Sequence, residues 1–262
     1  MEKQLIFFDI DGTLLDEKTF TVPSSTLNAI HQAQENGHLC FINTGRPIST
    51  IDQVILDIGF DGFVCGCGTY IEYHGKQIFH EELSEEKRRG VIQKSFEYNI
   101  ESVLEGKQGA FFRNDCSHPF MVACRNRYQE EGFPTFKYSK EDNIVFDKFA
   151  ASYDETANIE SFKNFLEPEF EVIQRDVGFI EVIPSHCSKA TGIQKLVDYL
   201  DTTLDNTISI GDSTNDLSML TFTAKSVAMG NSNPILFDIV TFVTTDITDN
   251  GIENALKHYH VI

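Results

Sequence analysis

The chain has 262 residues, a net charge of −19 and 41% hydrophobic residues, with 22 phenylalanines and no tryptophan. The hydrophobic share supports a packed interior and excludes a disordered polymer, and the length suits a core domain with an insertion. A polyanion repels nucleic acid backbones and anionic lipid surfaces, so both are excluded as partners, and an anionic substrate would need a local cation to hold it.

The N-terminal segment and the cysteines indicate where the chain resides. Residues 1–8 lack the charged and apolar regions of a signal peptide, and no apolar run approaches the roughly 18 residues of a membrane span. The six cysteines follow no zinc or disulfide spacing, and the one close pair, Cys65 and Cys67, is interpreted as two small residues at a strand end. A reduced, cytoplasmic setting is therefore expected.

Strand and helix patterns alternate in the first part of the chain. An apolar run over 5–8 is typical of a strand covered on both faces, and a helix is predicted from Pro23 up to Gly37. A strand over 38–42, a helix over 51–58 and a strand over 62–65 follow. This alternation predicts an α/β fold in which helices cover both faces of a parallel sheet.

The middle of the chain has a different pattern, and the first one returns after it. A hairpin over 71–78 is followed by mixed predictions: helices over 85–98, 121–131 and 158–166, and paired strands over 170–173 and 178–183. Parallel-type elements then resume: helices over 190–200 and 216–221, and strands over 207–210, 226–229 and 241–243. We expect an α+β domain over 81–185, inserted into a core made of 1–80 and 186–262. Such a chain could work as a monomer.

Polar residues gather where core strands are predicted to end. They come after three different strands: Asp9 and Asp11, Thr44 and Arg46, and Asp212 and Asp216. Open parallel sheets place their functional loops at the carboxyl ends of the strands, so these clusters should converge at one edge of the sheet. Lys189 instead opens a predicted helix.

The carboxylates indicate a metal ion. Asp9 and Asp11 stand two residues apart and can face one ligand in extended chain, and Asp212 adds a third carboxylate. Carboxylates at close range need a cation or a shared proton, and an oxygen-only set without His or Cys suits Mg²⁺. Taken singly, Asp9–Thr13 is also typical of a turn and Gly211–Asp216 of an acidic helix start.

Two further segments could hold a phosphate group. Thr44, Gly45 and Arg46 offer a hydroxyl, a close-approach glycine and a guanidinium at a strand end before a helix. Lys189 could supply a compact positive charge to a transferred phosphoryl group, or be an ordinary solvated lysine.

Together these residues resemble the haloacid dehalogenase-like superfamily of phosphatases. Its four motifs occur in order along almost the whole chain: D-x-D-G-T at Asp9–Thr13, the strand-terminal Thr44, the helix-opening Lys189, and G-D-x-x-N-D at Gly211–Asp216. The resemblance implies a Rossmann-like three-layer α/β/α core with a parallel sheet.

A finer likeness is to the Cof-like branch, which carries an inserted C2-type cap between the second and third motifs. Three segments resemble that branch: Glu181–Pro184, Val227–Asn231 and Asp249–Ile252. The nearest likeness is to bacterial sugar-phosphate phosphatases. The chain departs from the branch at Cys67-Gly68, where Asn-Gly is usual, and also has Lys189-Ala190 in place of Lys-Gly and Asn250-Gly251 in place of Asp-Gly.

The likeness implies a covalent mechanism. Asp9 would attack phosphorus and form an aspartyl-phosphate, and Asp11 would protonate the leaving alkoxide and then deprotonate the hydrolytic water. Mg²⁺ would be held by Asp9, Asp212 and the main-chain oxygen of Asp11.

The remaining site residues would bind the phosphoryl group or support the residues that bind it. The likeness assigns phosphate contacts to Thr44, Gly45, Lys189 and Asn215, with Arg46 either a phosphate contact or a helix-start ion pair. Asp216 would steady Lys189 or a metal-bound water. The inserted domain would act as a lid that excludes water and selects the leaving group.

The sequence leaves three hypotheses about the function open. The first is a magnesium-dependent phosphatase of a small-molecule phosphate monoester, and the second is a sugar-phosphate phosphotransferase or mutase that uses the same Asp9 chemistry. The third is a non-catalytic regulator that binds a phosphometabolite, although such a regulator would usually have lost Asp9 or Asp11. Hexose and pentose phosphates, pyridoxal phosphate and flavin mononucleotide are all open as substrates.

Overall fold

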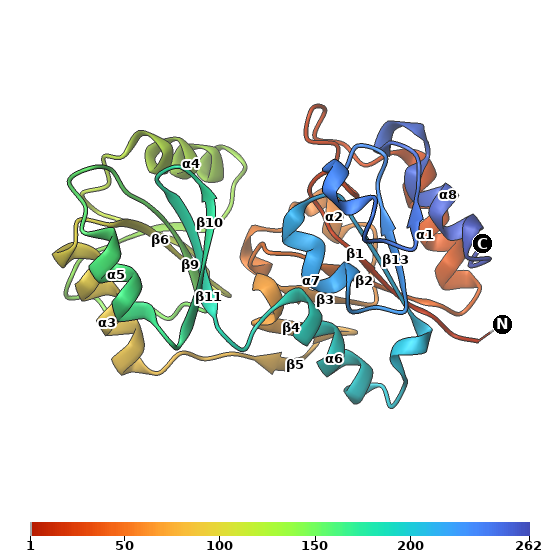
Figure 1. Ribbon diagram of the computed structural model, residues 1–262, viewed down its shortest axis with the longest axis horizontal. Coiled ribbons are helices and arrows are strands. Elements are labelled where there is room, and N and C mark those ends of the chain that lie inside the picture. Colours follow the sequence, from red (N-terminus) through yellow and green to blue (C-terminus); the bar gives the residue numbers. More distant parts are fainter. Residues whose placement is uncertain (1) are drawn as a thin grey trace. The chain divides into compact units, whose positions relative to one another are not determined.

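The computed structural model describes residues 2–262, which form two compact units (Figure 1). The first unit comprises the chain up to Gly45, Asp52–Phe79 and Ser188–Ile262, and the second comprises Arg46–Ile51 and His80–Cys187. The segment Arg46–Ile51, assigned above to the core, thus groups with the second unit.

The first unit is built on a sheet that contains eight strands within the described residues. Their spatial order is β14 (Phe242–Val243), β13 (Lys225–Ala228), β12 (Thr207–Gly211), β1 (Leu5–Phe8), β2 (Leu39–Asn43), β3 (Gly62–Cys65), β4 (Tyr70–Tyr73) and β5 (Lys76–His80). The pairings from β14 to β3 are parallel, and β4 lies antiparallel to β3. The predicted hairpin therefore extends the core sheet at one edge.

Helices cover both faces of this sheet. They are α1 (Ser24–Glu35), α2 (Gln53–Leu56), α6 (Lys189–Tyr199), α7 (Leu217–Leu220) and α8 (Gly251–His258). Leu5 and Phe7 pack with α6 and α7, whereas the alternate residues Ile6 and Phe8 are fully buried on the opposite face. On that second side α1 packs against both β2 and α8. A strand buried on both faces requires the continuous apolar run seen at 5–8.

The predicted helix over 51–58 is shorter than expected. The structure has a 3-10 turn, η1 (Ile48–Thr50), and then only Gln53–Leu56 as α-helix. The backbone of Ile51 and Asp52 is extended, and Gly59 is left-handed at φ +82°, so the helix can propagate in neither direction. The C-terminal helix α8 was not predicted, because its apolar face is only two turns long.

The second unit contains a sheet of six strands among the described residues. Their spatial order is β10 (Phe170–Asp176), β11 (Phe179–Pro184), β9 (Lys148–Ser152), β6 (Glu101–Gly106), β7 (Gly109–Arg113) and β8 (Thr135–Tyr138). All neighbours are antiparallel except β7 and β8, which are parallel. This is the mixed arrangement that the middle of the sequence predicts.

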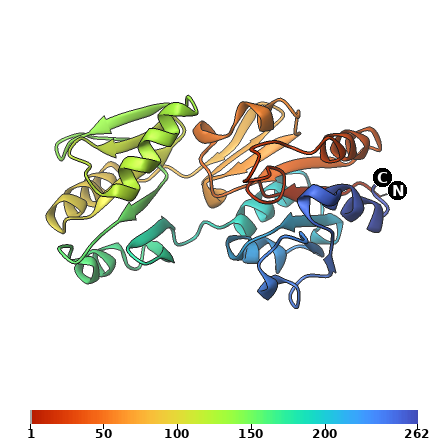
Figure 2. The ribbon, with the colours of Figure 1, turned by 90° about the horizontal axis from the view of Figure 1, so that it is seen from above.

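Three helices cover the two faces of the second sheet. Val91 of α3 (Glu85–Glu97) and Phe162 of α5 (Ile159–Leu166) pack on one face with Leu104 and Phe149. The helix α4 (Pro119–Glu130) packs on the other face through its buried Met121, and Figure 2 shows it lying across the strands. The phenylalanines of this unit serve mainly as core, as interpreted from the composition.

A buried network of charges lies on the sheet of the second unit. Lys148 Nζ is 2.5 Å from Glu181 Oε1 and 3.2 Å from Glu105 Oε2, and Arg175 Nε donates to Glu181 Oε2 at 2.8 Å. Burial alone would raise the pKa of Glu181, but Lys148 and Arg175 outweigh it and lower that pKa to about 2. Glu181 is therefore ionised at all physiological pH values.

Candidate active site

Four charged side chains of the first unit meet at the carboxyl ends of two neighbouring strands. Asp9 follows β1 and Asp212 follows β12; the two strands run in parallel, and the N–H of Asp9 donates to the carbonyl of Ile210 at 3.0 Å. Lys189 is the first residue of α6, and Asp216 ends the 3-10 helix η4 (Thr214–Asp216). The sheet topology thus brings together residues that lie far apart in the sequence.

The ammonium group of Lys189 bridges two of the carboxylates. Its Nζ lies 2.6 Å from Oδ1 of Asp9 and 2.5 Å from Oδ1 of Asp216. Only 1% of Lys189, 3% of Asp9 and none of Asp216 is exposed. Carboxylate oxygens of Asp9, Asp212 and Asp216 all lie within 4.8 Å of one another. Three carboxylates around one ammonium leave an excess of negative charge when all are ionised.

This excess perturbs the ionisation of the cluster. Burial, followed by the carboxylate of Asp216, raises the pKa of Asp9 to about 7, although Lys189 acts in the opposite direction. Burial and the carboxylate of Asp9 raise the pKa of Asp212 to about 8. Burial alone would lower the pKa of Lys189, but Asp216 and Asp9 raise it well above its usual range. The lysine is therefore a permanent cation, and two carboxylates lack a full counter-charge.

The two under-compensated carboxylates fit a hard divalent cation. Asp9 and Asp212 offer oxygen atoms only, which is the ligand chemistry of Mg²⁺. Asp216 is already engaged, because its Oδ1 accepts from Lys189 and its Oδ2 accepts the backbone N–H of Asp212 at 2.9 Å and of Ser213 at 3.1 Å. The chain therefore favours Asp9 and Asp212 as side-chain ligands and Asp216 as a support.

The loop after β1 is packed directly against Asp212. Gly12 adopts a left-handed backbone at φ +73°, and a Cβ at this position would lie 2.4 Å from Asp212 Oδ2. The hydroxyl of Thr13 donates to Asp212 Oδ1 at 3.4 Å. Asn231 Nδ2 donates to the carbonyl of Gly12 at 2.7 Å, and Asn231 Oδ1 accepts the N–H of Ile247 at 3.0 Å. The glycine is thus required both by its conformation and by the space that Asp212 occupies.

Gly12→Ala should disable the site, and Gly75→Ala is a matched control. Both glycines are left-handed (φ +73° and +75°), so both alanine variants carry about 1–2 kcal/mol of backbone strain. Only the alanine at 12 collides with Asp212, since nothing lies within 4 Å of a Cβ at Gly75. We expect turnover at this site to be about 10²-fold lower for Gly12→Ala and near wild type for Gly75→Ala, because displacing a reacting group by about 1 Å has that scale of effect. Equal turnover of the two variants would contradict the assigned role of this contact.

The structure places the other predicted residues around this cluster or at its border. Asp11 lies close enough for its carboxylate to contribute to the raised pKa of Asp9. Thr44 is buried at the end of β2, and its backbone carbonyl accepts the N–H of Cys67 at 3.1 Å. Asn215 lies in η4 and accepts a hydrogen bond from the hydroxyl of Ser213.

Gly45 and Arg46 stand at the border between the two units. Gly45 is the last residue of its segment in the first unit, and Arg46 opens the short segment of the second. The guanidinium of Arg46 donates to the carbonyl of Thr50 at 3.3 Å.

Asn43 is a supporting residue that was not singled out from the sequence, whereas Cys67 was noted there as a departure from the usual Asn. Asn43 is buried and donates from Nδ2 to the carbonyl of Lys189 at 3.1 Å, which fixes the start of α6 relative to β2. Cys67 is buried with a left-handed backbone at φ 55°, a conformation that asparagine tolerates better than cysteine. The position of Asn43 directly before Thr44-Gly45 was the one feature of the sequence that could have indicated its supporting role. A single Asn is too common for that feature to be informative.

The chain belongs to the haloacid dehalogenase-like hydrolase family, whose model matches residues 6–256. It is 29% identical to the protein YkrA of Bacillus subtilis over 98% of both chains. It is 26% identical to YitU of the same organism, a 5-amino-6-(5-phospho-D-ribitylamino)uracil phosphatase, over 97% of both chains. Among solved structures, the subclass IIB sugar phosphatase BT4131 superposes with a TM-score of 0.82 at 25% identity, covering 99% of this chain and all of its own.

Within that family the chain is a Cof-like phosphatase, an enzyme that hydrolyses phosphate monoesters of small molecules. The predicted family, the fold class and the enzyme class are all confirmed by these similarities and by the two-sheet architecture. Among the helices of residues 2–262, none combines the length and apolar character that a membrane span requires.

Proposed function

We propose that this phosphatase is magnesium-dependent, acts on a sugar phosphate or a related small phosphate ester, and forms an aspartyl-phosphate on Asp9. The observation that supports this best is the buried Asp9–Lys189–Asp216 arrangement with Asp212 beside it. The similarity to a sugar phosphatase and to a phosphatase of a phosphoribityl compound favours a polyhydroxylated leaving group. We also propose that the enzyme works in the cytoplasm, as a monomer.

The two aspartates of the first motif would perform the covalent chemistry. An oxygen of Asp9 attacks phosphorus and the bond from phosphorus to the leaving oxygen breaks, while Asp11 gives its proton to that oxygen. Asp11 then removes a proton from water, whose oxygen attacks the phosphoryl group and releases Asp9. Mg²⁺, when bound by Asp9, Asp212 and the main-chain oxygen of Asp11, supplies positive charge that lets an anionic ester approach the carboxylates.

The cationic and polar residues would hold the phosphoryl oxygens. Lys189 is pre-positioned beside Asp9 by Asp216 and by the hydrogen bond from Asn43 to its own carbonyl. We assign further phosphate contacts to Thr44, Gly45 and Asn215, and assign Arg46 to the start of its own turn. Fixed donors of this kind stabilise transition-state charge without reorganising.

The ionisation of the carboxylates makes stability depend on pH and on metal together. The pKa values of Asp9 and Asp212, about 7 and about 8 in the folded chain, exceed the unfolded value of 3.8, so the folded state binds protons that the unfolded state releases. Without divalent ions the melting temperature should therefore fall as pH rises from about 5.5 to about 8.5. Mg²⁺ should raise it more at the higher pH, where both ligands would otherwise be uncompensated anions.

Differential scanning fluorimetry in EDTA and in Mg²⁺ measures this effect. The double variant Asp9→Asn/Asp212→Asn should show a flatter pH dependence and no response to Mg²⁺, because it lacks both titrating ligands. An equal Mg²⁺ response in the double variant would place the metal elsewhere.

The second unit would act as the cap that excludes water and selects the leaving group. Arg113 of this unit has structural contacts: it pairs with Asp115 at 2.8 Å, lies over the ring of Phe96 and donates to the carbonyl of Ile100.

Phosphate release from a panel of esters tests the proposal and narrows the substrate. The panel should contain hexose and pentose phosphates, pyridoxal phosphate and flavin mononucleotide, each with and without Mg²⁺, with Asp9→Asn as the inactive control. We expect Mg²⁺-dependent release of inorganic phosphate without an acceptor sugar. Transfer to an added sugar in place of release would indicate a phosphotransferase.

A further inference from the structure

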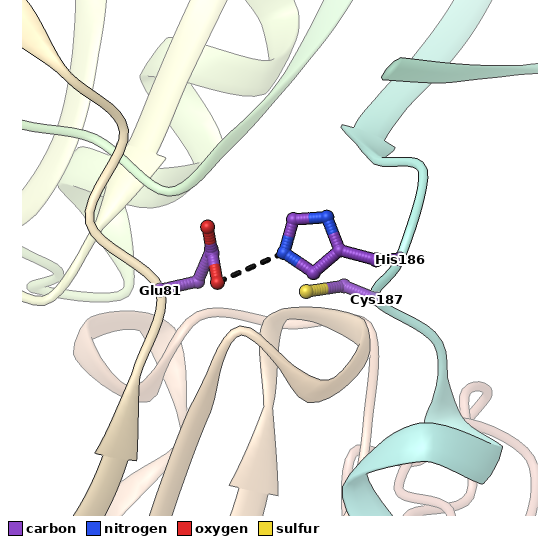
Figure 3. A group of neighbouring side chains, drawn as sticks. All are labelled: Glu81, His186 and Cys187. Atoms are coloured by element: carbon purple, nitrogen blue, oxygen red, sulfur yellow. Dashed lines mark ion pairs between the residues drawn. The ribbon is translucent and has the colours of Figure 1, made fainter. Parts of the chain in front are cut away.

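A second group of metal-ligating side chains lies outside the phosphatase site. Glu81 follows strand β5, and His186 and Cys187 follow strand β11, at the two places where the chain passes between the units. Figure 3 shows the imidazole of His186 directed at the carboxylate of Glu81, with the sulfur of Cys187 below the ring in this view. His186 Nε2 lies 2.9 Å from Glu81 Oε2, and ligand atoms of all three residues lie within 4.8 Å of one another.

The donor set differs in kind from the aspartate cluster. It combines one imidazole nitrogen, one sulfur and one carboxylate oxygen, whereas the other cluster offers oxygen only. Hard ions such as Mg²⁺ avoid sulfur ligands, and Zn²⁺ accepts all three donor types. These three residues could not be recognised as metal ligands from the sequence. Glu81 is far from His186 along the chain, so the three residues do not follow a zinc-ligand spacing.

The distance between His186 and Glu81 is close to that in a tetrahedral zinc site. With bond lengths of about 2.0–2.1 Å to oxygen and nitrogen and 2.3 Å to sulfur, tetrahedral ligands lie about 3.3 Å (N to O) and about 3.6 Å (N to S) apart. The present N···O distance of 2.9 Å has to widen by a few tenths of an ångström to admit the ion. The side chain of His186 is 59% exposed and that of Glu81 is 23% exposed, so both can make this adjustment without disturbing a packed core.

Space for a fourth ligand exists beside the group. A cavity of about 310 Å³ in the second unit is lined by Glu81 and His186 together with Ser185, Glu82 and Glu169. Three protein ligands and one water molecule from such a cavity complete a four-coordinate site. Glu169 is paired with Lys87, which also lines the cavity, at 2.9 Å, so the further carboxylate that favours a cation there is Glu82.

We propose that Glu81, His186 and Cys187 form a binding site for a thiophilic divalent cation of the Zn²⁺ type. On binding, the Cys187 thiol releases its proton to solvent, and the ion replaces the direct contact between His186 and Glu81. All three residues belong to the second unit, so the ion would join the beginning and the end of its segment His80–Cys187. Cys187 also precedes Ser188, whose side chain caps the helix that begins at Lys189, so the bound ion would be adjacent in sequence to the phosphatase site.

Cobalt titration of the full-length chain, freed of metal, tests this site directly. Co²⁺ bound by a thiolate gives a sulfur-to-cobalt charge-transfer band in the near ultraviolet, which the aspartate cluster cannot produce because it has no sulfur. We expect this band at one equivalent of Co²⁺ and its disappearance on addition of Zn²⁺. Cys187→Ser should abolish it, whereas Cys124→Ser, a partly buried cysteine of α4, should leave it unchanged.

Two further variants keep the test decisive if Cys187→Ser fails to fold. Glu81→Gln and His186→Gln change exposed or partly exposed side chains, and each should weaken Co²⁺ binding by at least about tenfold, since even outer-shell partners contribute that much. A wild-type chain without the charge-transfer band overturns the proposal. So does a band that survives in a folded Cys187→Ser variant, or Co²⁺ affinity that is unchanged in both Glu81→Gln and His186→Gln. The group would then be a structural ion pair only.

Discussion

Asp9→Asn is expected to reduce phosphate release by at least about 10⁴-fold, the scale of loss seen when a covalent nucleophile is removed from an enzyme. The amide is nearly isosteric with the carboxylate, but it cannot attack phosphorus and is a poorer metal ligand. Asn should also keep the folded chain intact without metal, because the substitution removes one of the carboxylates whose burial is unfavourable. A large loss of activity without loss of stability is therefore the predicted combination.

Acid-quenched reactions and circular dichroism together measure this prediction. Intact-protein mass spectrometry should detect a phosphorylated species in the wild-type chain, with the modified peptide containing Asp9, and no such species in Asp9→Asn. Asp205→Asn makes the same chemical change at an exposed position of the first unit and should behave like the wild type. Normal turnover of Asp9→Asn in the presence of Mg²⁺ would falsify the covalent mechanism.

Lys189→Met is expected to impair both activity and stability. The methionine fills a similar volume but removes the ammonium group that contacts Asp9 and Asp216, at 2.6 Å and 2.5 Å. Removing one partner of a buried ion pair costs about 3–5 kcal/mol of unfolding free energy, because the remaining charge is left without compensation. Turnover should fall by about 10²–10³-fold, since the phosphoryl group loses a fixed positive charge but keeps its nucleophile.

The expected difference in turnover between Lys189→Met and Asp9→Asn distinguishes the roles of the two residues. Lys189→Met should retain a small residual turnover and still form the phosphorylated species slowly, whereas Asp9→Asn should form none. Lys225→Met is the matched control, because Lys225 is a partly buried lysine of the same unit whose ammonium donates to Gln4 Oε1 at 2.8 Å. If Lys189→Met kept full turnover and a wild-type denaturation midpoint, the lysine would be neither a phosphate ligand nor the counter-ion of the cluster.

The sequence by itself determined the family, the fold class and the type of enzyme. Buried parallel strands need unbroken apolar runs, so 5–8 and 207–210 could be recognised locally, and the polar residues that follow them mark the carboxyl ends of neighbouring strands. Recognising each strand from its own apolar run was sufficient to predict the site, because a functional residue follows each strand. The sheet topology then brings those residues together.

Only the tertiary structure decided how the charges are compensated and which residues support them. Whether Lys189 is solvated or buried between two carboxylates depends on the packing of α6 against the sheet, and the sequence of one helix start cannot give that packing. For the same reason the buried pair of Lys148 and Glu181 resembles ordinary surface charges when read along the chain. The burial of a charged side chain and its pairing with a residue far away in sequence both depend on how the strands and helices pack. That packing is a property of the folded chain alone.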